Sequence, residues 1–146
     1  MRQEIYLIKS FYCCIDSFLP ATQPEQHIIC ENMAKFNNGK IIFYGAEDVL
    51  VAKQQPFIYD KLKRTPNIDG VIFFTINQFC YDTALNINLI KKILNLKISI
   101  HFARENISFF NQKELKKNLP EVYSYYYSFN RKRKKYASEI KKKLGI

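Results

Sequence analysis

Short apolar runs alternate with amphipathic stretches along most of the chain, and this alternation predicts an α/β fold. Four runs have the length and character of buried strands: residues 5–8 (IYLI), 41–44 (IIFY), 71–74 (VIFF) and 98–102 (ISIHF). The intervening segments carry apolar residues at helical spacing. Strands that alternate with helices are typical of a parallel sheet. We therefore expect a three-layer, four-stranded parallel sheet with helices on both faces.

Capping and turn residues set the limits of the predicted helices. Thr22 and Glu25 have the spacing of a capping box, with Thr22 as the N-cap, and Asn37-Asn38-Gly39 is a stop signal for that helix. Pro56 opens a second helix, and an amphipathic segment from residue 84 to 94 predicts a third. The residues after the first strand, through Pro20, are expected to form a polar and aromatic loop.

The regular alternation ends after residue 110. A short helix is predicted from Gln112 to Asn118, followed by the aromatic run 122–129 (VYSYYYSF) and then a basic helix. The chain has no internal repeat and no Gly/Ser-rich linker. We therefore expect an α/β domain over residues 1–120 and an aromatic, then basic, helical extension over residues 121–146.

Composition narrows the class of protein. The chain is 47% hydrophobic and 15% aromatic, which excludes a disordered protein. No apolar run approaches the roughly 20 residues that a membrane-spanning helix needs. Glu4 and Lys9 interrupt the first apolar stretch, so we expect no signal peptide. These features predict a cytoplasmic protein.

The net charge of +10 is concentrated near the C-terminus. Between Arg131 and Lys143 there are eight basic residues and one acidic residue, Glu139. This segment has three interpretations: a solvated terminus, a nucleic-acid contact, or attachment to an anionic membrane or partner. The aromatic run before it is expected to pack on the domain or to form a subunit interface, as in a homodimer.

The sequence contains no signature of a metal site or a nucleotide cofactor. The four cysteines lack C-x-x-C spacing, so we interpret them as reduced thiols and predict no metal. With four glycines in total and no Gly-rich phosphate motif, no cofactor is indicated. His101 falls within a predicted strand, where we expect it to be buried in the core.

Ligands of open parallel sheets bind beyond the carboxyl ends of the strands. The polar residues expected there can supply a hydroxyl, amides, carboxylates and a guanidinium. They are Lys9, Ser10, Glu47, Asp48, Thr75, Asn77, Gln78, Arg104 and Glu105.

The order of these features resembles the catalytic domain of serine recombinases, the resolvase and invertase family. YLIKS (6–10) matches the first strand, with Ser10 at the nucleophile position, PEQHII (24–29) matches a Gln-containing helix, and FTINQFCY (74–81) and ARENI (103–107) match later segments. The resemblance implies a resolvase-like, or flavodoxin-like, sheet.

The departures from that family concern its chemistry. Asn77 and Gln78 stand where the family has an Asp-Arg pair, Tyr81 replaces a further arginine, and Ile8 replaces the arginine before the serine. Those arginines neutralise charge in a phosphodiester transition state, and losing one such contact costs about two to three powers of ten in rate. We therefore expect the fold to be shared and the reaction to be absent.

The chain also resembles the sporadic carbohydrate cluster proteins of bacterial surface-polysaccharide gene clusters. The similarity covers residues 5–110 and includes a Pro-x-Gln helix start at Pro24 and Gln26, a YGAED segment (44–48) and the HFARENI strand (101–107). The family often has a Ser-Arg-Pro-Phe stretch where this chain has Lys-Ser-Phe-Tyr (9–12). The resemblance implies a role in making an envelope carbohydrate.

Together these features predict a site for a sugar phosphate or a nucleotide sugar. Arg104 would hold the anionic group, and Asn77 and Gln78 would bond sugar hydroxyls, because amides both donate and accept. Ser10 and Gln26 complete the expected substrate-binding set, and Glu105 or Glu47 would be the general acid/base of an enzyme. The alternative is a catalytically inactive, recombinase-like module that binds DNA or assembles proteins.

Overall fold

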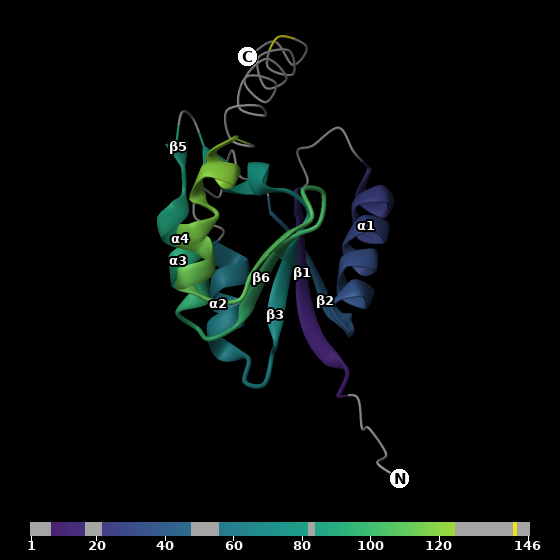
Figure 1. Cartoon of the computed structure of the whole chain (residues 1–146). Coiled ribbons are helices and arrows are strands. Elements are labelled where there is room, and N and C mark those ends of the chain that lie inside the picture. The colour runs from purple at the N-terminus through teal and green to yellow at the C-terminus, as the bar shows by residue number, and fades with distance from the viewer. Residues whose placement is uncertain (1–6, 17–21, 48–55, 82–83, 125–141, 143–146) are drawn as a thin grey trace.

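The computed structural model describes residues 7–16, 22–47, 56–81, 84–124 and 142. The elements in chain order are β1 (Lys9–Asp16), α1 (Gln23–Phe36), β2 (Gly39–Glu47), α2 (Pro56–Arg64), β3 (Gly70–Phe73), the 3-10 turn η1 (Ile76–Phe79), β4 (Cys80–Tyr81), β5 (Ala84–Leu85), α3 (Ile87–Leu94), β6 (Ser99–Phe102), β7 (Ile107–Phe109) and α4 (Gln112–Lys117). Figure 1 shows α1 on one side of the main sheet and α2 and α3 on the other.

The main sheet has five strands and is mixed. Its order is β2-β1-β3-β6-β7, with parallel pairs throughout except β6-β7, which is antiparallel. The α/β class is therefore confirmed, but the predicted four-stranded parallel sheet is wrong. The chain reverses through residues 103–106, where Asn106 has a φ of 56°, so the fifth strand folds back beside the fourth. An asparagine tolerates this left-handed conformation better than most residues.

The first strand lies further along the chain than its apolar pattern predicted. Leu7 and Ile8 are 84% and 66% exposed, whereas Phe11 to Asp16 are all buried. The residues expected to form a loop thus include the central strand β1, which pairs with both β2 and β3. Tyr12 is compatible with this burial because its hydroxyl bonds to Thr65 Oγ1 at 2.7 Å.

The predicted limits of the first helix are confirmed. Thr22 is the N-cap of α1 and forms the full capping box with Glu25, and Asn37 is the C-cap. The third helix begins later than expected, because Asn86 caps it through Leu89 N and the preceding two residues form β5. The other two predicted helices correspond to α2 and α4.

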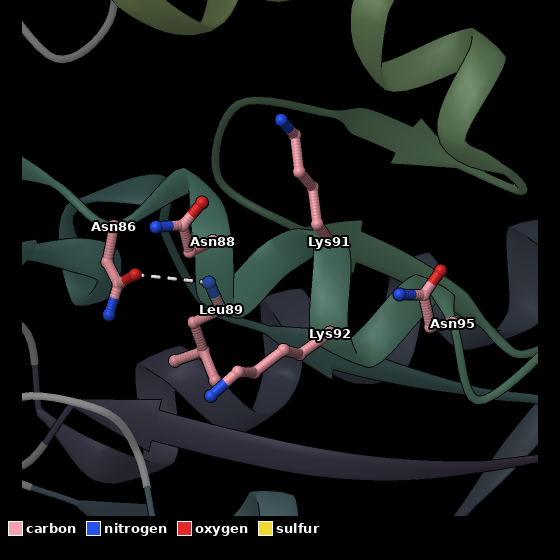
Figure 2. Close-up of a pocket in the computed structure, with 6 residues that line it drawn as sticks. All are labelled: Asn86, Asn88, Leu89, Lys91, Lys92 and Asn95. Carbon is pink, nitrogen blue, oxygen red and sulfur yellow. Dashed lines mark hydrogen bonds between the residues drawn. The ribbon is translucent and has the colours of Figure 1, made fainter.

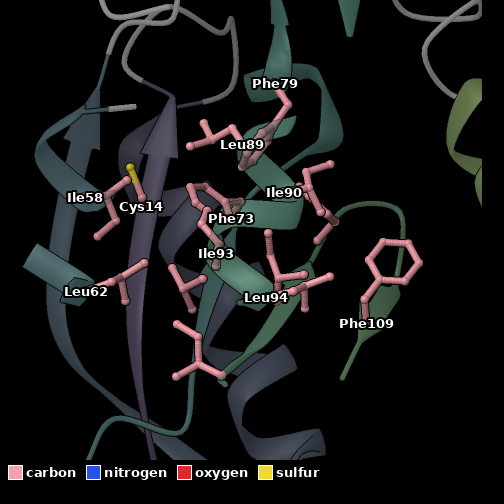
Figure 3. Packing of buried hydrophobic residues seen from close by; sticks show 14 of the residues in the cluster. Cys14, Ile58, Leu62, Phe73, Phe79, Leu89, Ile90, Ile93, Leu94 and Phe109 are labelled. Carbon is pink, nitrogen blue, oxygen red and sulfur yellow. The ribbon is translucent and has the colours of Figure 1, made fainter. Parts of the chain in front are cut away.

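Two hydrophobic clusters lie on opposite faces of the sheet. The larger joins β-strand residues such as Phe73 to α2 and α3, as Figure 3 shows. The smaller lies under α1 and contains Phe11, Cys13, Ile15, Cys30, Met33, Ala34, Ile72 and Phe74. Full burial of a Phe, Ile or Met side chain stabilises the fold by about 1.5–3 kcal/mol.

The larger cluster also includes Val122, which is fully buried. The packed core therefore reaches past residue 120, where we expected the α/β domain to end. Apart from residue 142, the basic segment lies outside the described residues, as do residues 125–129 of the aromatic run. Among the helices that the structure describes, none combines the length and apolar character that spanning a membrane requires.

Candidate functional site

The carboxyl ends of β1, β3 and β6 meet at one edge of the sheet, and a buried polar network joins them. The chain leaves β3 at Phe74 and Thr75 and turns through η1, all four residues of which are buried. The backbone N–H groups of Ala103 and Arg104 donate to the carbonyls of Phe73 and Phe74, at 2.9 and 2.8 Å. These bonds hold the segment after β6 beside the segment after β3.

Glu105 lies at the centre of this network and is buried. Thr75 Oγ1 donates to its Oε2 at 2.6 Å, and Ile76 N donates to its Oε1 at 2.8 Å. Burial raises the pKa of Glu105, while the hydrogen bonds from Thr75 and Ile76 and the positive charge of Arg104 oppose that rise. Both carboxylate oxygens thus hold the turn that follows β3, which makes Glu105 a positioning residue in this geometry.

Gln78 connects two strand ends through its amide. Its Oε1 accepts from Thr75 N at 3.0 Å, and its Nε2 donates to the carbonyl of Cys14 at 3.1 Å. The side chain is almost fully buried. Gln78 therefore satisfies backbone groups of β1 and of the segment after β3. The sequence predicted only that its amide would bond sugar hydroxyls, not this structural role.

Gln26 has a similar role at the start of α1. Its Oε1 accepts from Asp16 N at 3.1 Å, and its Nε2 donates to Asp16 O at 2.9 Å. This reciprocal pair ties the first turns of α1 to the last residue of β1. Asp16 was expected to lie in a loop, although the continuous apolar run from Phe11 to Ile15 was a signal for a buried strand.

Asn77 differs from its neighbours in the network. Its side chain is 4% exposed, and its Oδ1 atom is the one buried side-chain oxygen or nitrogen without a hydrogen-bond partner in the described part of the chain. Its backbone N–H donates to Thr75 Oγ1 at 3.3 Å, so the turn fixes the residue in place. An unpaired buried acceptor costs about 1–3 kcal/mol, a cost that a ligand donor at this position would offset.

Arg104 is exposed and lies one residue before Glu105, at the rim of the network. Glu47 ends β2 at the same edge of the sheet, but its side chain lies outside the described residues. Ser10 lies elsewhere: it is the second residue of β1, at the amino end of the strand, where its N–H donates to Asp69 Oδ2 at 2.8 Å. The expectation that Ser10 joins the strand-end site is wrong. A strand was predicted to end near Ser10, whereas β1 begins there.

A separate hollow of about 410 Å³ lies along α3. Figure 2 shows the residues around it: Asn86, Asn88, Leu89, Lys91, Lys92 and Asn95. Its lining of amides and ammonium groups is chemically similar to what we expected at the strand ends. None of the site residues predicted from the sequence lines it.

The described ranges contain three buried cysteines, and they were also searched for side chains that could bind a metal ion. Cys13, Cys14 and Cys30 are all buried. A hydrogen bond with Cys30, together with burial, raises the pKa of Cys13, which keeps it protonated and unreactive. Within the same ranges, no group of three or more His, Cys, Asp and Glu side chains could hold a metal ion.

The chain was compared with protein families, with curated proteins and with solved structures, and none of these comparisons found a match. No family model matches the sequence. No curated protein matches it. No solved structure matches the fold.

Proposed function

We propose that the protein binds a sugar phosphate or a nucleotide sugar at the carboxyl ends of the strands and acts in the biosynthesis of a bacterial surface carbohydrate in the cytoplasm. The pathway assignment rests on the resemblance to the sporadic carbohydrate cluster proteins. The ligand class rests on the chemistry of the strand-end residues.

The observation that carries the proposal is the buried, unpaired Oδ1 of Asn77. A neutral carbonyl oxygen accepts a hydrogen bond from a hydroxyl without requiring a counter-charge, which suits a sugar. Gln78 and Gln26 support this acceptor indirectly, because their amides hold the strand ends around it.

Arg104 provides the positive charge that an anionic ligand group requires. It is exposed at the rim of the network, and a guanidinium can bond a phosphate through two parallel N–H groups. Glu105 acts in this proposal as the residue that positions the turn carrying Asn77, since its two oxygens accept from Thr75 and Ile76.

The test is a thermal-unfolding panel on the full-length protein, with sugar phosphates, nucleotide sugars, nucleotides and one DNA duplex. A ligand at about 100 times its Kd stabilises by about 2.7 kcal/mol, which corresponds to a rise in Tm of roughly 5–10 °C. We expect a sugar derivative to raise the Tm, and we expect Asn77→Ala to abolish the rise.

Asn88→Ala is the matched control, because Asn88 is an exposed amide that lines the hollow on α3. Loss of the shift in Asn88→Ala, with the shift kept in Asn77→Ala, would move the site to α3 and contradict the proposal. A shift with duplex DNA alone, weakening as salt rises, would favour the recombinase-like binding module instead.

A further inference from the structure

A second polar cluster lies on the face of the β6-β7 hairpin that is turned toward α1, away from Asn77 and Glu105. His101 on β6 and Ser108 on β7 are paired in register, and His101 Nδ1 lies 2.6 Å from Ser108 Oγ. On the other side of the ring, His101 Nε2 lies 2.7 Å from Ser99 Oγ. His101 is fully buried, whereas Ser108 is half-buried on the edge strand.

The direction of these hydrogen bonds depends on the tautomer of His101. When Ser99 Oγ donates its proton to the carbonyl of Asp69, 3.3 Å away, its oxygen accepts from His101 Nε2–H. Nδ1 of the same neutral ring then carries a lone pair, and it accepts the proton of Ser108 at 2.6 Å. In this tautomer His101 is a base toward Ser108, the arrangement that activates serine nucleophiles.

The surroundings keep His101 neutral. Burial and the nearby Lys9 ammonium lower its pKa to about 4. Phe11 and Phe110 contact the ring edge-to-face, with centroids at 5.3 and 5.5 Å.

A groove of about 270 Å³ lies between α1 and this hairpin. Its lining residues are Ile29, Asn32, Met33, Phe36, Ala103 and Asn106. Ala103 and Asn106 lie at the turn of the hairpin, two residues from His101 and Ser108, and two residues span about 7 Å along a strand. Phe36 is 80% exposed beside it, which leaves apolar surface open to a ligand.

We propose that Ser108 is a nucleophile for acyl transfer from small apolar esters, with His101 as its general base, Ser99 as the positioning residue and the groove as the acyl site. Ser108 Oγ forms a bond to the ester carbonyl carbon as its proton moves to His101 Nδ1. The bond to the alkoxy oxygen then breaks, and the alkoxide takes that proton and leaves as the alcohol. Water attacks the acyl-serine in the same way, which releases the acid and restores the Ser108 proton.

The groove also offers donors for the carbonyl oxygen. Asn32 and Asn106 line it, and their carboxamide N–H groups can bond the oxyanion that forms during attack. This site goes beyond the proposed sugar ligand, and its test does not depend on that ligand.

The experiment treats the full-length protein with an alkyl fluorophosphonate, whose phosphorus bonds to a serine oxygen as fluoride and the serine proton leave. Intact mass and peptide mapping report the modified residue, and p-nitrophenyl butyrate reports turnover. We expect a single modification at Ser108, with a rate that rises through about pH 4 and is level at neutral pH, because His101 must be neutral.

Three variants test whether Ser108 reacts because His101 activates it or only because the serine is exposed. His101→Gln should lower the rate of modification about 100-fold, since general-base catalysis contributes about 10²–10⁴. Ser99→Ala keeps the ring in place and should lower the rate less, with an altered pH profile. Ser124→Ala, which removes an exposed serine, should react like the native protein.

Thermal unfolding confirms that each variant is folded before its rate is compared. Modification of Ser108 at the same rate in His101→Gln, or in the urea-unfolded chain, would overturn the proposal. So would a native protein left unmodified at Ser108. Any of these three results would mean that the side chains of Ser99, His101 and Ser108 only connect the strands structurally.

Discussion

The strand-end network and the β6-β7 hairpin both bury polar side chains, but they satisfy them differently. At the strand ends, Gln78, Gln26 and Glu105 bond mainly to backbone groups, and the acceptor of Asn77 is unpaired. On the hairpin, side chains bond to one another in a chain that ends at the Ser108 hydroxyl.

This difference separates structural residues from candidates for function. Replacing a side chain that satisfies buried backbone groups lowers the free energy of unfolding strongly, because those groups lose a hydrogen-bond partner. A side chain with an unpaired acceptor, or at the end of a hydrogen-bonded chain, contributes less to folding. Asn77 and Ser108 are such residues.

The largest effect is expected for Gln78→Ala. This change removes the hydrogen bonds of Gln78 to Thr75 N–H and to the Cys14 carbonyl, at about 1–3 kcal/mol each, so the free energy of unfolding should fall by about 4 kcal/mol. Urea unfolding measures the change. The control is Gln112→Ala, whose amide bonds Lys91 O and Asn95 Oδ1 at an exposed position, and its loss should be well below that of Gln78→Ala. Equal losses would contradict the distinction.

The hairpin should make the protein sensitive to acid. The pKa of His101 falls from its ordinary value of 6.5 to about 4 in the folded state, so the unfolded chain binds the extra proton. The stabilisation is complete above about pH 6.5 and is lost as the pH falls toward 4, by up to about 3 kcal/mol.

Unfolding of the native protein and of His101→Gln between pH 7 and pH 4 measures this effect. Burial raises the pKa of Glu105, so its contribution has the opposite sign: it is present at low pH and is lost as pH rises through the folded pKa. The difference between the two proteins at each pH isolates His101. A difference that stays constant with pH would show that His101 does not titrate as described.

Gly70→Ala should damage the start of the hairpin's hydrogen-bonded chain. A Cβ at Gly70 would meet the side-chain and backbone oxygens of Ser99 and, at 3.0 Å, the ring of Phe11. Overpacking of this kind costs about 1–3 kcal/mol, which chemical denaturation would measure. If Ser99 positions His101, the rate of Ser108 modification should fall as well. A stable variant that reacts at the native rate would argue against that role.

The smallest effect on stability is expected for Asn77→Ala. The change removes an acceptor that has no partner, so the free energy of unfolding should stay within about 1 kcal/mol of the native value, or rise. The same urea titration used for Gln78→Ala measures it. A loss as large as that of Gln78→Ala would show that Asn77 is structural and would remove the main support for a ligand site.

Several elements were predictable because a few neighbouring residues specify them. Thr22, Glu25 and Asn37 gave the limits of α1, since a capping box and a C-cap satisfy the end groups of a helix locally. The apolar runs of β2, β3 and β6 likewise gave strands near the expected positions. His101 was expected to be buried and is.

Other features depended on competition between distant segments. The run IYLI is as apolar as the Phe11–Ile15 run, so apolar character alone could not choose between them; the latter pairs with β2 and β3 and is buried on both faces. That choice moved Ser10 to the amino end of β1 and brought Asp16 into contact with Gln26.

By itself, the sequence determined the α/β class, the capped helix and the polar composition of the loop after β3. The tertiary structure decided which of those polar groups have partners. Gln78 and Cys14 are 64 residues apart, and they meet only because β1 and β3 are neighbours in the sheet. The unpaired acceptor of Asn77 and the pairing of His101 with Ser108 depend in the same way on strand order and register, which no local pattern encodes.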